Sequence, residues 1–207
     1  IDRRGEGLFA LMLEAPVPDD EAEALAARGL KIMPLMPGAF GRDVHPSSTH
    51  GVLIRVYPVD SFKGRFQGEP DRRAPQLSGI VRVIVAVADI EHAAAAYSTG
   101  FRLAVDPIVE DRARGVAVAH CHPPKGGIIE LVAVRDESRP FAQAIARHLR
   151  EDREGMYALV LQSPDLQVTA ASLRGHGIGV QPAADDPAVL EIPRADAFGA
   201  LIRIEAA

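Results

Sequence analysis

The feature that most constrains the fold is an internal repeat with an offset of 148 residues. The segment Gly-Val-Leu-Ile-Arg at residues 51–55 recurs as Gly-Ala-Leu-Ile-Arg at residues 199–203. Without gaps, residues 6–57 are identical to residues 154–205 at 14 of 52 positions. Short apolar runs that agree by chance do not keep one register for that long, so the chain contains a duplicated module.

Each copy follows the pattern of one strand, one helix and three short strands. In residues 1–60 the apolar run at 8–14 predicts the first strand, the acidic residues after Pro18 favour the start of a helix, and Gly29 ends it. Three more strands are predicted near residues 30–34, 40–45 and 51–57. The module is therefore β-α-β-β-β.

Two further modules of this pattern are predicted between residues 79 and 207. The first spans 79–134, with strands at 80–87, near 101–109, at 115–121 and at 127–134, and a helix at 90–98 capped by Asp89. The second spans 155–206, with strands at 156–162, near 178–182, 188–192 and 199–205, and a helix at 165–175. A connecting helix is expected at 136–152, and the Pro- and Gly-containing stretch 61–78 predicts a linker.

Composition excludes several classes of function. The 207 residues carry a formal net charge of −5 and no basic stripe, which argues against nucleic-acid binding. No apolar run approaches the ~18 residues of a membrane span, so no membrane partner is expected. The single cysteine, Cys121, excludes a disulfide framework and favours a cytoplasmic location.

Three segments carry a family resemblance: Asp-Arg-Arg-Gly-Glu-Gly-Leu-Phe at 2–9, His-Pro-Ser-Ser-Thr-His-Gly-Val-Leu-Ile at 45–54, and the strand and helix from Ile80 to Tyr97. The first two resemble methylmalonyl-CoA epimerases and the third resembles the opening of a glyoxalase-type module. Together they resemble the vicinal oxygen chelate superfamily. The resemblance implies an α+β, glyoxalase-like fold, in which β-α-β-β-β modules pair into half-closed, cup-shaped barrels around a ligand cavity.

The resemblance also implies how the modules pair. Residues 79–207 would form one complete two-module domain. The module at 1–60 would lack its partner, which we expect upstream of Ile1, so that the full protein has four modules and two cups. An alternative is that this module completes its cup across a homodimer.

Members of the superfamily typically hold a metal with side chains from the first and fourth strands of each module. The resemblance places these positions, in the three modules, at Ala10, Arg82 and Ala158 for the first strand, and at Arg55, Glu130 and Arg203 for the fourth. Only Glu130 has a ligand-type side chain, because alanine has no donor atom and a guanidinium has no free lone pair. One carboxylate is too few for a catalytic metal, and the His-His-Glu triad of an extradiol dioxygenase is absent.

Arg82, Glu130 and Arg203 are expected to point into the one complete cup, and three roles remain open for them. The favoured one is an ion cluster in which the two arginines flank and neutralise Glu130. In the second, an arginine binds a ligand carboxylate or phosphate. The third makes Glu130 a catalytic base, which is the weakest, because neighbouring arginines depress a carboxyl pKa.

The histidines also allow more than one role. His120 and His122 lie on one face of a strand, where they could form a metal-binding or acid–base pair. The favoured interpretation is that they are the polar end of a strand that leads into a loop. His45 and His50 are interpreted as loop residues. Cys121 points to the opposite face and is expected to pack rather than react.

The sequence thus predicts a glyoxalase- or epimerase-like protein with a degenerate metal site, which binds a small, anionic metabolite. The candidate ligand-binding residues are Arg55, Arg82, His120, His122, Glu130 and Arg203. No cofactor is predicted, and a divalent metal is expected only with the missing upstream module. One alternative is a metal-dependent lyase or isomerase whose centre uses that module, and another is a structural module for oligomerisation.

Overall fold

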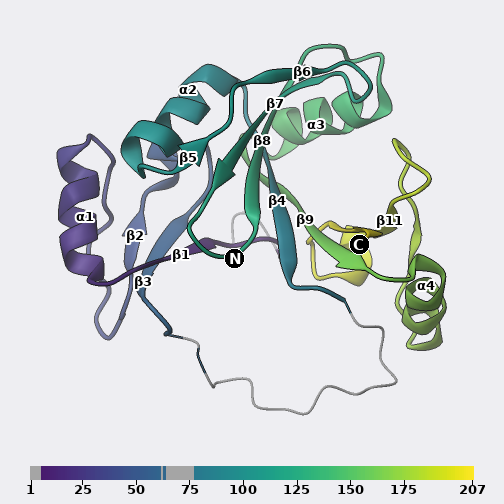
Figure 1. Cartoon of the computed structure of the whole chain (residues 1–207), viewed down its shortest axis with the longest axis horizontal. Helices are drawn as coiled ribbons and strands as arrows, with labels where there is room; N and C mark the ends of the chain where they lie inside the picture. Colours follow the sequence, from purple (N-terminus) through teal and green to yellow (C-terminus); the bar gives the residue numbers. More distant parts are fainter. Residues whose placement is uncertain (1–5, 62, 64–76) are drawn as a thin grey trace.

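The computed structural model describes residues 6–61, 63 and 77–207, so most of the expected linker at 61–78 lies outside the described part. The strands form two sheets (Figure 1). The smaller sheet has the order β1-β3-β2, with β1 at Leu11–Ala15, β2 at Arg42–Val44 and β3 at Ile54–Pro58. Helix α1 (Pro18–Ala27) connects β1 and β2.

The larger sheet has the order β10-β11-β12-β9-β4-β8-β7-β5. Its ninth strand, β6, also pairs with β7. Its strands are β4 (Ile80–Ala86), β5 (Ala104–Val105), β6 (Val109–Asp111), β7 (Val116–His122), β8 (Ile128–Val134), β9 (Gly155–Ser163), β10 (Gln181–Pro182), β11 (Leu190–Ile192) and β12 (Ile202–Ala206). The accompanying helices are α2 (Ile90–Ala95), α3 (Pro140–Glu151) and α4 (Leu166–Gly175). The expected α+β class is confirmed.

All three modules share one strand arrangement. The first strand of each lies parallel to the last, pairing β1 with β3, β4 with β8 and β9 with β12. The last strand is antiparallel to the one before it, which gives the pairs β3–β2, β8–β7 and β12–β11. The strand expected near 30–34 is wrong as a strand, because only an isolated bridge between Ile32 and Val44 forms there.

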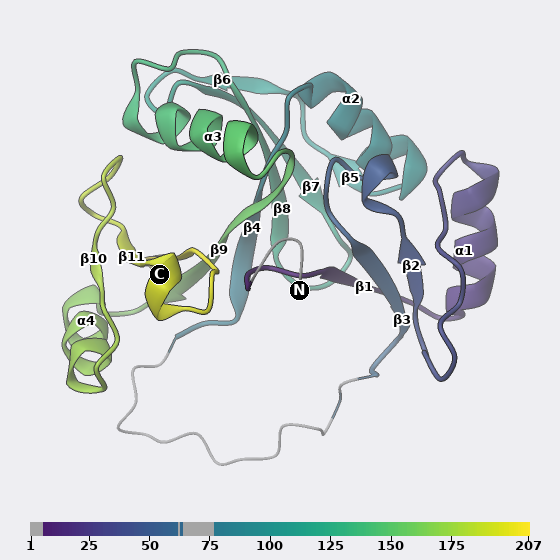
Figure 2. The ribbon, with the colours of Figure 1, turned by 180° about the vertical axis from the view of Figure 1, so that it is seen from behind.

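The second and third modules are joined by their first strands. β4 and β9 pair antiparallel, so that the two halves of the larger sheet are related by an approximate two-fold axis. Figure 2 shows this sheet curving from β7 through β4 and β9 to β10 without closing into a barrel. We call the curved sheet of residues 80–134 and 155–206 the cup.

The outer face of the cup packs against helix α2 and the first module. Alternating apolar residues of β4, such as Val83 and Val85, share one core with Tyr97 below α2 and with Leu25 and Ile54 of the first module. These side chains are buried because the period of two places them on the same face. The first module is therefore part of one continuous core with the cup.

The inner face of the cup is partly filled by α3. Phe141 and Ile145 of this helix pack against Ile84, Val118 and Val160, which come from both halves of the sheet. The ring of Phe141 meets Tyr157 edge-on, with centroids 6.1 Å apart. α3 thus covers part of the concave face and leaves the remainder as a polar cavity.

The first and third modules meet at two equivalent glycine contacts. Gly51 has φ +79°, and a Cβ there would overlap the backbone carbonyl of Glu154. Gly199, which is 148 residues later, has φ +81°, and a Cβ there would overlap the carbonyl of Glu6. Only glycine accommodates both the left-handed backbone and the close approach. The two contacts indicate a second approximate two-fold axis, between the first and third modules.

Candidate functional site

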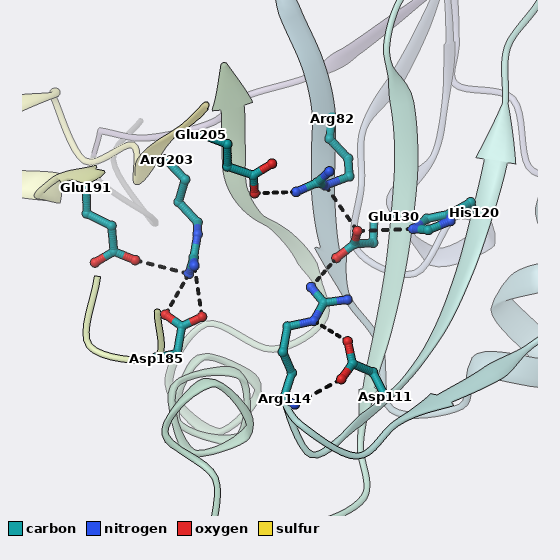
Figure 3. A network of polar contacts seen from close by, with 9 residues as sticks. All are labelled: Arg82, Asp111, Arg114, His120, Glu130, Asp185, Glu191, Arg203 and Glu205. Carbon is teal, nitrogen blue, oxygen red and sulfur yellow. Dashed lines mark hydrogen bonds and ion pairs between the residues drawn. The ribbon is translucent and has the colours of Figure 1, made fainter. Parts of the chain in front are cut away.

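A cavity of about 420 Å³ lies on the inner face of the cup, beside α3. Strands β4, β7 and β8 form one wall, and β12 with the loop between β10 and β11 forms the other. Its walls are mostly charged; they are lined by Arg82, Ile84, Ala113, Arg114, His120, Glu130, Asp185, Asp186, Val189, Arg203 and Glu205. Figure 3 shows nine of the residues that build its polar contacts.

The carboxylate of Glu130 is the most enclosed acidic group of the cavity, with 2% of the residue exposed. Its Oε1 accepts a hydrogen bond of 2.8 Å from Arg114, and its Oε2 lies 3.1 Å from both Nε2 of His120 and Nε of Arg82. Burial alone would raise the pKa of Glu130. The hydrogen bond from His120 and the charges of Arg114 and Arg82 outweigh this and lower the pKa to about 2.

Arg82 connects Glu130 to the opposite wall. Its Nη2 donates a hydrogen bond of 2.5 Å to Oε1 of Glu205 on β12. Its buried Nε has no aligned hydrogen-bond partner among the described residues, in spite of the short distance to Glu130. The Nε of Arg82 is therefore ion-paired with Glu130 but makes no aligned hydrogen bond inside the cavity.

Arg203 does not flank Glu130, and that part of the favoured ion cluster is wrong. Its guanidinium binds Asp185 through two hydrogen bonds of 2.8 and 3.0 Å and Glu191 through one of 3.1 Å (Figure 3). Arg203 is 4% exposed, so these carboxylates are its counter-ions on its own wall. The second arginine beside Glu130 is Arg114 instead.

Arg114 was not singled out from the sequence. It follows β6 in the turn before β7, where its Nε donates a hydrogen bond of 2.7 Å to Asp111. Two arginines from the two walls, Arg114 and Arg203, lie over the ring of Phe141 at 5.1 and 5.4 Å from its centroid. The spacing Asp-x-x-Arg is the only signal in the sequence for this residue, and it is common in turns.

The two histidines of β7 occupy different environments. His120 lines the cavity, whereas His122 lies outside it and is 2.9 Å from Oδ2 of Asp106. The same carboxylate oxygen is 3.8 Å from Nδ1 of His120. Of the pair, only His120 is placed to touch a ligand in the cavity. Between them on the opposite face, Cys121 is fully buried, and burial raises the pKa of its thiol to about 12.

Arg55 lies in the first module and does not reach the cavity. It forms a bidentate pair with Asp43 on the neighbouring strand, at 2.5 and 2.6 Å. The pair is the repeat equivalent of Arg203 and Glu191, which also face each other across two strands. The acidic partner explains why an arginine is accommodated at this position in both copies.

The side chains around Glu130 do not fit a divalent cation. Arg82 and Arg114 offer only N–H donors to this carboxylate, and Ala158 offers no ligand atom. No cluster of three or more His, Cys, Asp or Glu side chains with metal-site geometry occurs in residues 6–61, 63 and 77–207. A metal bound by these residues would have to displace two guanidinium groups that already neutralise the carboxylate.

His50, interpreted from the sequence only as a loop residue, is 9% exposed and joins all three modules. Its Nδ1 lies 3.0 Å from Oε1 of Glu154, and its Nε2 lies 2.9 Å from Nδ1 of His92 at the start of α2. The same oxygen of Glu154 accepts a hydrogen bond from the backbone of Ala88. These contacts position the first module on the outside of the cup, away from the cavity.

Comparison with solved structures identifies the fold. The chain superposes on a methylmalonyl-CoA epimerase from Mycobacterium tuberculosis with a TM-score of 0.54 and 23% sequence identity, covering 69% of this chain and 93% of the epimerase. A methylmalonyl-CoA epimerase variant from Streptomyces coelicolor, in complex with 2-nitronate-propionyl-CoA, gives a TM-score of 0.51 and 19% identity over 64% and 99% of the two chains. A hypothetical protein from Bacillus halodurans gives 0.53 and 17% over 64% and 95%.

No family model and no curated protein matches the sequence. The structural similarity therefore establishes the fold, which is the glyoxalase-like fold of these epimerase structures. The model has no helix with the length and apolar character needed to cross a membrane, within the part of the chain that is described.

Proposed function

We propose that the cup binds a small metabolite carrying a carboxylate, and that it does so without a metal ion. The observation that carries this proposal is the environment of Glu130, which is the one ligand-type side chain among the six expected metal positions. Its carboxylate is contacted by Arg82, Arg114 and His120, where a metal ion would otherwise bind. The positive charges next to Glu130 are supplied by the protein itself.

Arg82 is the cation through which a ligand would bind. Its buried Nε–H makes no aligned hydrogen bond, and its other partner, Glu205, is half-buried at the end of β12 with 26% of its side chain exposed. A ligand carboxylate can take the place of Glu205, because the latter regains water when it turns outward. The planar guanidinium fits a carboxylate with two parallel hydrogen bonds.

The other two arginines are less available. Arg203 is held by Asp185 and Glu191, and Arg114 is held by Asp111 and Glu130. Removing Arg203 would leave Asp185 and Glu191, whose side chains are 10% and 15% exposed, without their counter-ion, which is strongly unfavourable. Arg114 is fixed to Asp111 a second time, because its backbone N–H also donates to that carboxylate. The cavity therefore has one exchangeable cation, and it suits a ligand with a single carboxylate better than a multiply charged one.

The geometry favours binding over proton abstraction by Glu130. A carboxyl with a pKa of about 2 is ionised at neutral pH but is a weak base. The related epimerases have been solved with methylmalonyl-CoA and with 2-nitronate-propionyl-CoA. A short acyl group bearing a carboxylate is therefore the first chemical class to test in this cavity.

The test is a calorimetric titration of the full chain with acetate, malonate, phosphate and methylmalonyl-CoA. We expect at least one carboxylate to bind, and Glu205→Gln to tighten its binding by roughly threefold to tenfold, because the competing charge on Arg82 is removed. Arg82→Lys should weaken binding by at least about tenfold, since the fork geometry is lost.

The matched control is Glu110→Gln, which makes the same change at an exposed residue that pairs with Arg135 outside the cavity. It should leave the affinity unchanged. Failure of every carboxylate to bind, or weaker binding by Glu205→Gln, would overturn the proposal.

A further inference from the structure

We propose that the ligand of the cavity is an amino carboxylate, in which a short methylene chain separates an ammonium group from the carboxylate. In this arrangement the carboxylate binds Arg82 on β4, and the ammonium binds Asp186 in the loop between β10 and β11. The inference rests on the carboxylate site proposed above and adds the second charged group of the ligand. It follows from the balance of charges in the cavity and from one carboxylate that has no counter-ion.

The charged side chains of the cavity are more often acidic than basic. Among the described residues, three arginines and four carboxylates line it: Arg82, Arg114, Arg203, Glu130, Asp185, Asp186 and Glu205. Two further carboxylates that do not line the cavity, Asp111 and Glu191, bind Arg114 and Arg203. Even a protonated His120 would leave six carboxylates against four cations. The cavity therefore has an excess of negative charge before a ligand enters.

Asp186 is the acidic group of the cavity that has no counter-ion among the described residues. Glu130 and Glu205 pair with Arg82, and Asp185 pairs with Arg203. The side chain of Asp186 accepts one hydrogen bond, to Oδ1 from the backbone N–H of Ala188 at 2.9 Å, and its Oδ2 has no partner in the part of the chain that the structure describes. Because Asp186 is exposed and lines the cavity, a cationic group of a ligand can reach this oxygen.

Glu191 shows that Arg203 does not neutralise the wall on which Asp186 lies. Burial raises the pKa of Glu191, and the charge of Asp185 raises it further. Arg203, at 3.1 Å from Glu191, lowers the pKa without offsetting the other two causes. One guanidinium is thus shared between two carboxylates, and Asp186 follows directly in the chain as a third. A cation from the ligand would stabilise this wall.

A ligand with only a carboxylate increases the excess of negative charge. When it replaces Glu205 at Arg82, the cavity keeps its cations and gains one negative charge. Like charges repel more strongly in a partly enclosed site than in bulk water, because the effective dielectric constant is lower. An ammonium on the same ligand cancels the added charge and gives Asp186 a counter-ion. The charge balance therefore favours a ligand with both groups.

The positions of the two anchoring residues favour an amino carboxylate with separated charges. Arg82 belongs to one half of the cup, and Asp186 belongs to a loop of the other half. In an α-amino acid the ammonium is bonded to the carbon next to the carboxylate, so it would lie beside Arg82, where like charges repel. A chain of two or more methylene groups carries the ammonium away from Arg82. Ile84, Ala113 and Val189 provide apolar surface in the cavity for such a chain.

Calorimetric titrations of the full chain with matched pairs of ligands test the inference. The pairs are propionate and β-alanine, butyrate and 4-aminobutyrate, and hexanoate and 6-aminohexanoate, which differ only in the terminal ammonium. We expect the amino compound of at least one pair to bind roughly threefold to tenfold more tightly than its partner, as one partly exposed ion pair provides. The alkylamine of the same chain length should bind at least about tenfold more weakly than that amino compound, because it leaves Arg82 without a carboxylate.

Asp186→Asn is the variant that tests the ammonium site. It removes the charge and keeps the oxygen that accepts the hydrogen bond from Ala188, so the loop should keep its conformation. The advantage of the amino compound over the plain carboxylate should fall to less than about twofold. The matched control is Asp20→Asn in the first turn of α1, outside the cavity, which should leave the advantage unchanged.

The titrations separate failure of this inference from failure of the carboxylate site. If the plain carboxylates bind and no amino compound binds more tightly than its partner, the ammonium site is wrong and the carboxylate site remains supported. If neither the plain carboxylates nor the amino compounds bind, the carboxylate site is wrong and the inference fails with it. An advantage that survives Asp186→Asn, or an alkylamine that binds as tightly as the amino compound, would also overturn the inference.

Discussion

At the scale of the residue, Glu130 determines the chemistry of the cavity. Two arginines and a histidine contact its carboxylate, and the residue is 2% exposed. An acid stabilised in this way contributes to folding only while it is ionised. This connects the electrostatics of the cavity to the stability of the whole chain.

The stability of the protein should therefore fall in acid because of this one residue. The folded pKa of Glu130, about 2, lies below its ordinary value of 4.5. Its stabilisation is complete above pH 4.5 and is lost as the pH falls toward 2, by about 3 kcal/mol in total. Glu130→Gln should lower the free energy of unfolding by a similar amount at pH 7, and the difference from wild type should shrink below pH 4.5. Chemical denaturation at pH 7, 4 and 3 measures this.

The control for this prediction is Glu110→Gln, whose exposed carboxylate should contribute less than about 1 kcal/mol at every pH. If Glu130→Gln were as stable as wild type at pH 7, or if the difference did not depend on pH, Glu130 would not be the buried ion described above.

At the scale of the element, α3 decides how much of the cup remains open. The helix begins at Pro140, and its apolar residues at Phe141, Ala142, Ile145 and Ala146 share one stripe. That stripe lies against both halves of the cup, and the exposed side carries the charged residues. The connection between the modules thus also fills the part of the inner face that lies beside the cavity.

Phe141→Ala tests that role. The residue is 1% exposed, packs on Tyr157 and supports Arg114 and Arg203, so we expect a loss of about 3 to 5 kcal/mol in the free energy of unfolding. Gln143→Ala, on the exposed side of the same helix, should change it by less than about 0.5 kcal/mol. Equal effects in urea titrations of the two variants would show that α3 does not pack inside the cup.

The elements also show what the sequence can and cannot predict. Strands β4, β7, β8 and β9 were predicted within one or two residues, because they are long apolar runs that are buried in a sheet. The stretch near 30–34 failed, since one bridge at Ile32 is all that the chain forms before Pro34. Short strands between turn residues carry too little apolar periodicity to be distinguished from loops.

For the site residues, too, prediction succeeded on regular strands and failed on loops. Those on regular strands, Arg82, His120 and Glu130, were placed by alternation and by the family resemblance. Those on loops, Arg114 and Asp185, were not, because a loop has no period from which the direction of a side chain can be read. The pairing of Arg203 with Asp185 and Glu191, and not with Glu130, depends entirely on where that loop lies.

At the scale of the molecule, the three modules have three different environments. The second and third pair through β4 and β9 and enclose the cavity, and the first packs on the outer face of the cup. The proposed ligand belongs to the cavity that the second and third modules enclose.

We propose that protein cations replace a metal next to Glu130. Calorimetric titration of the chelator-treated full chain with Co²⁺ tests it most directly, with Zn²⁺ and Mn²⁺ as further probes. We predict no stoichiometric binding in the cup, because Arg82 and Arg114 already neutralise the carboxylate. Binding of one metal per chain that Glu130→Gln abolishes would contradict the account.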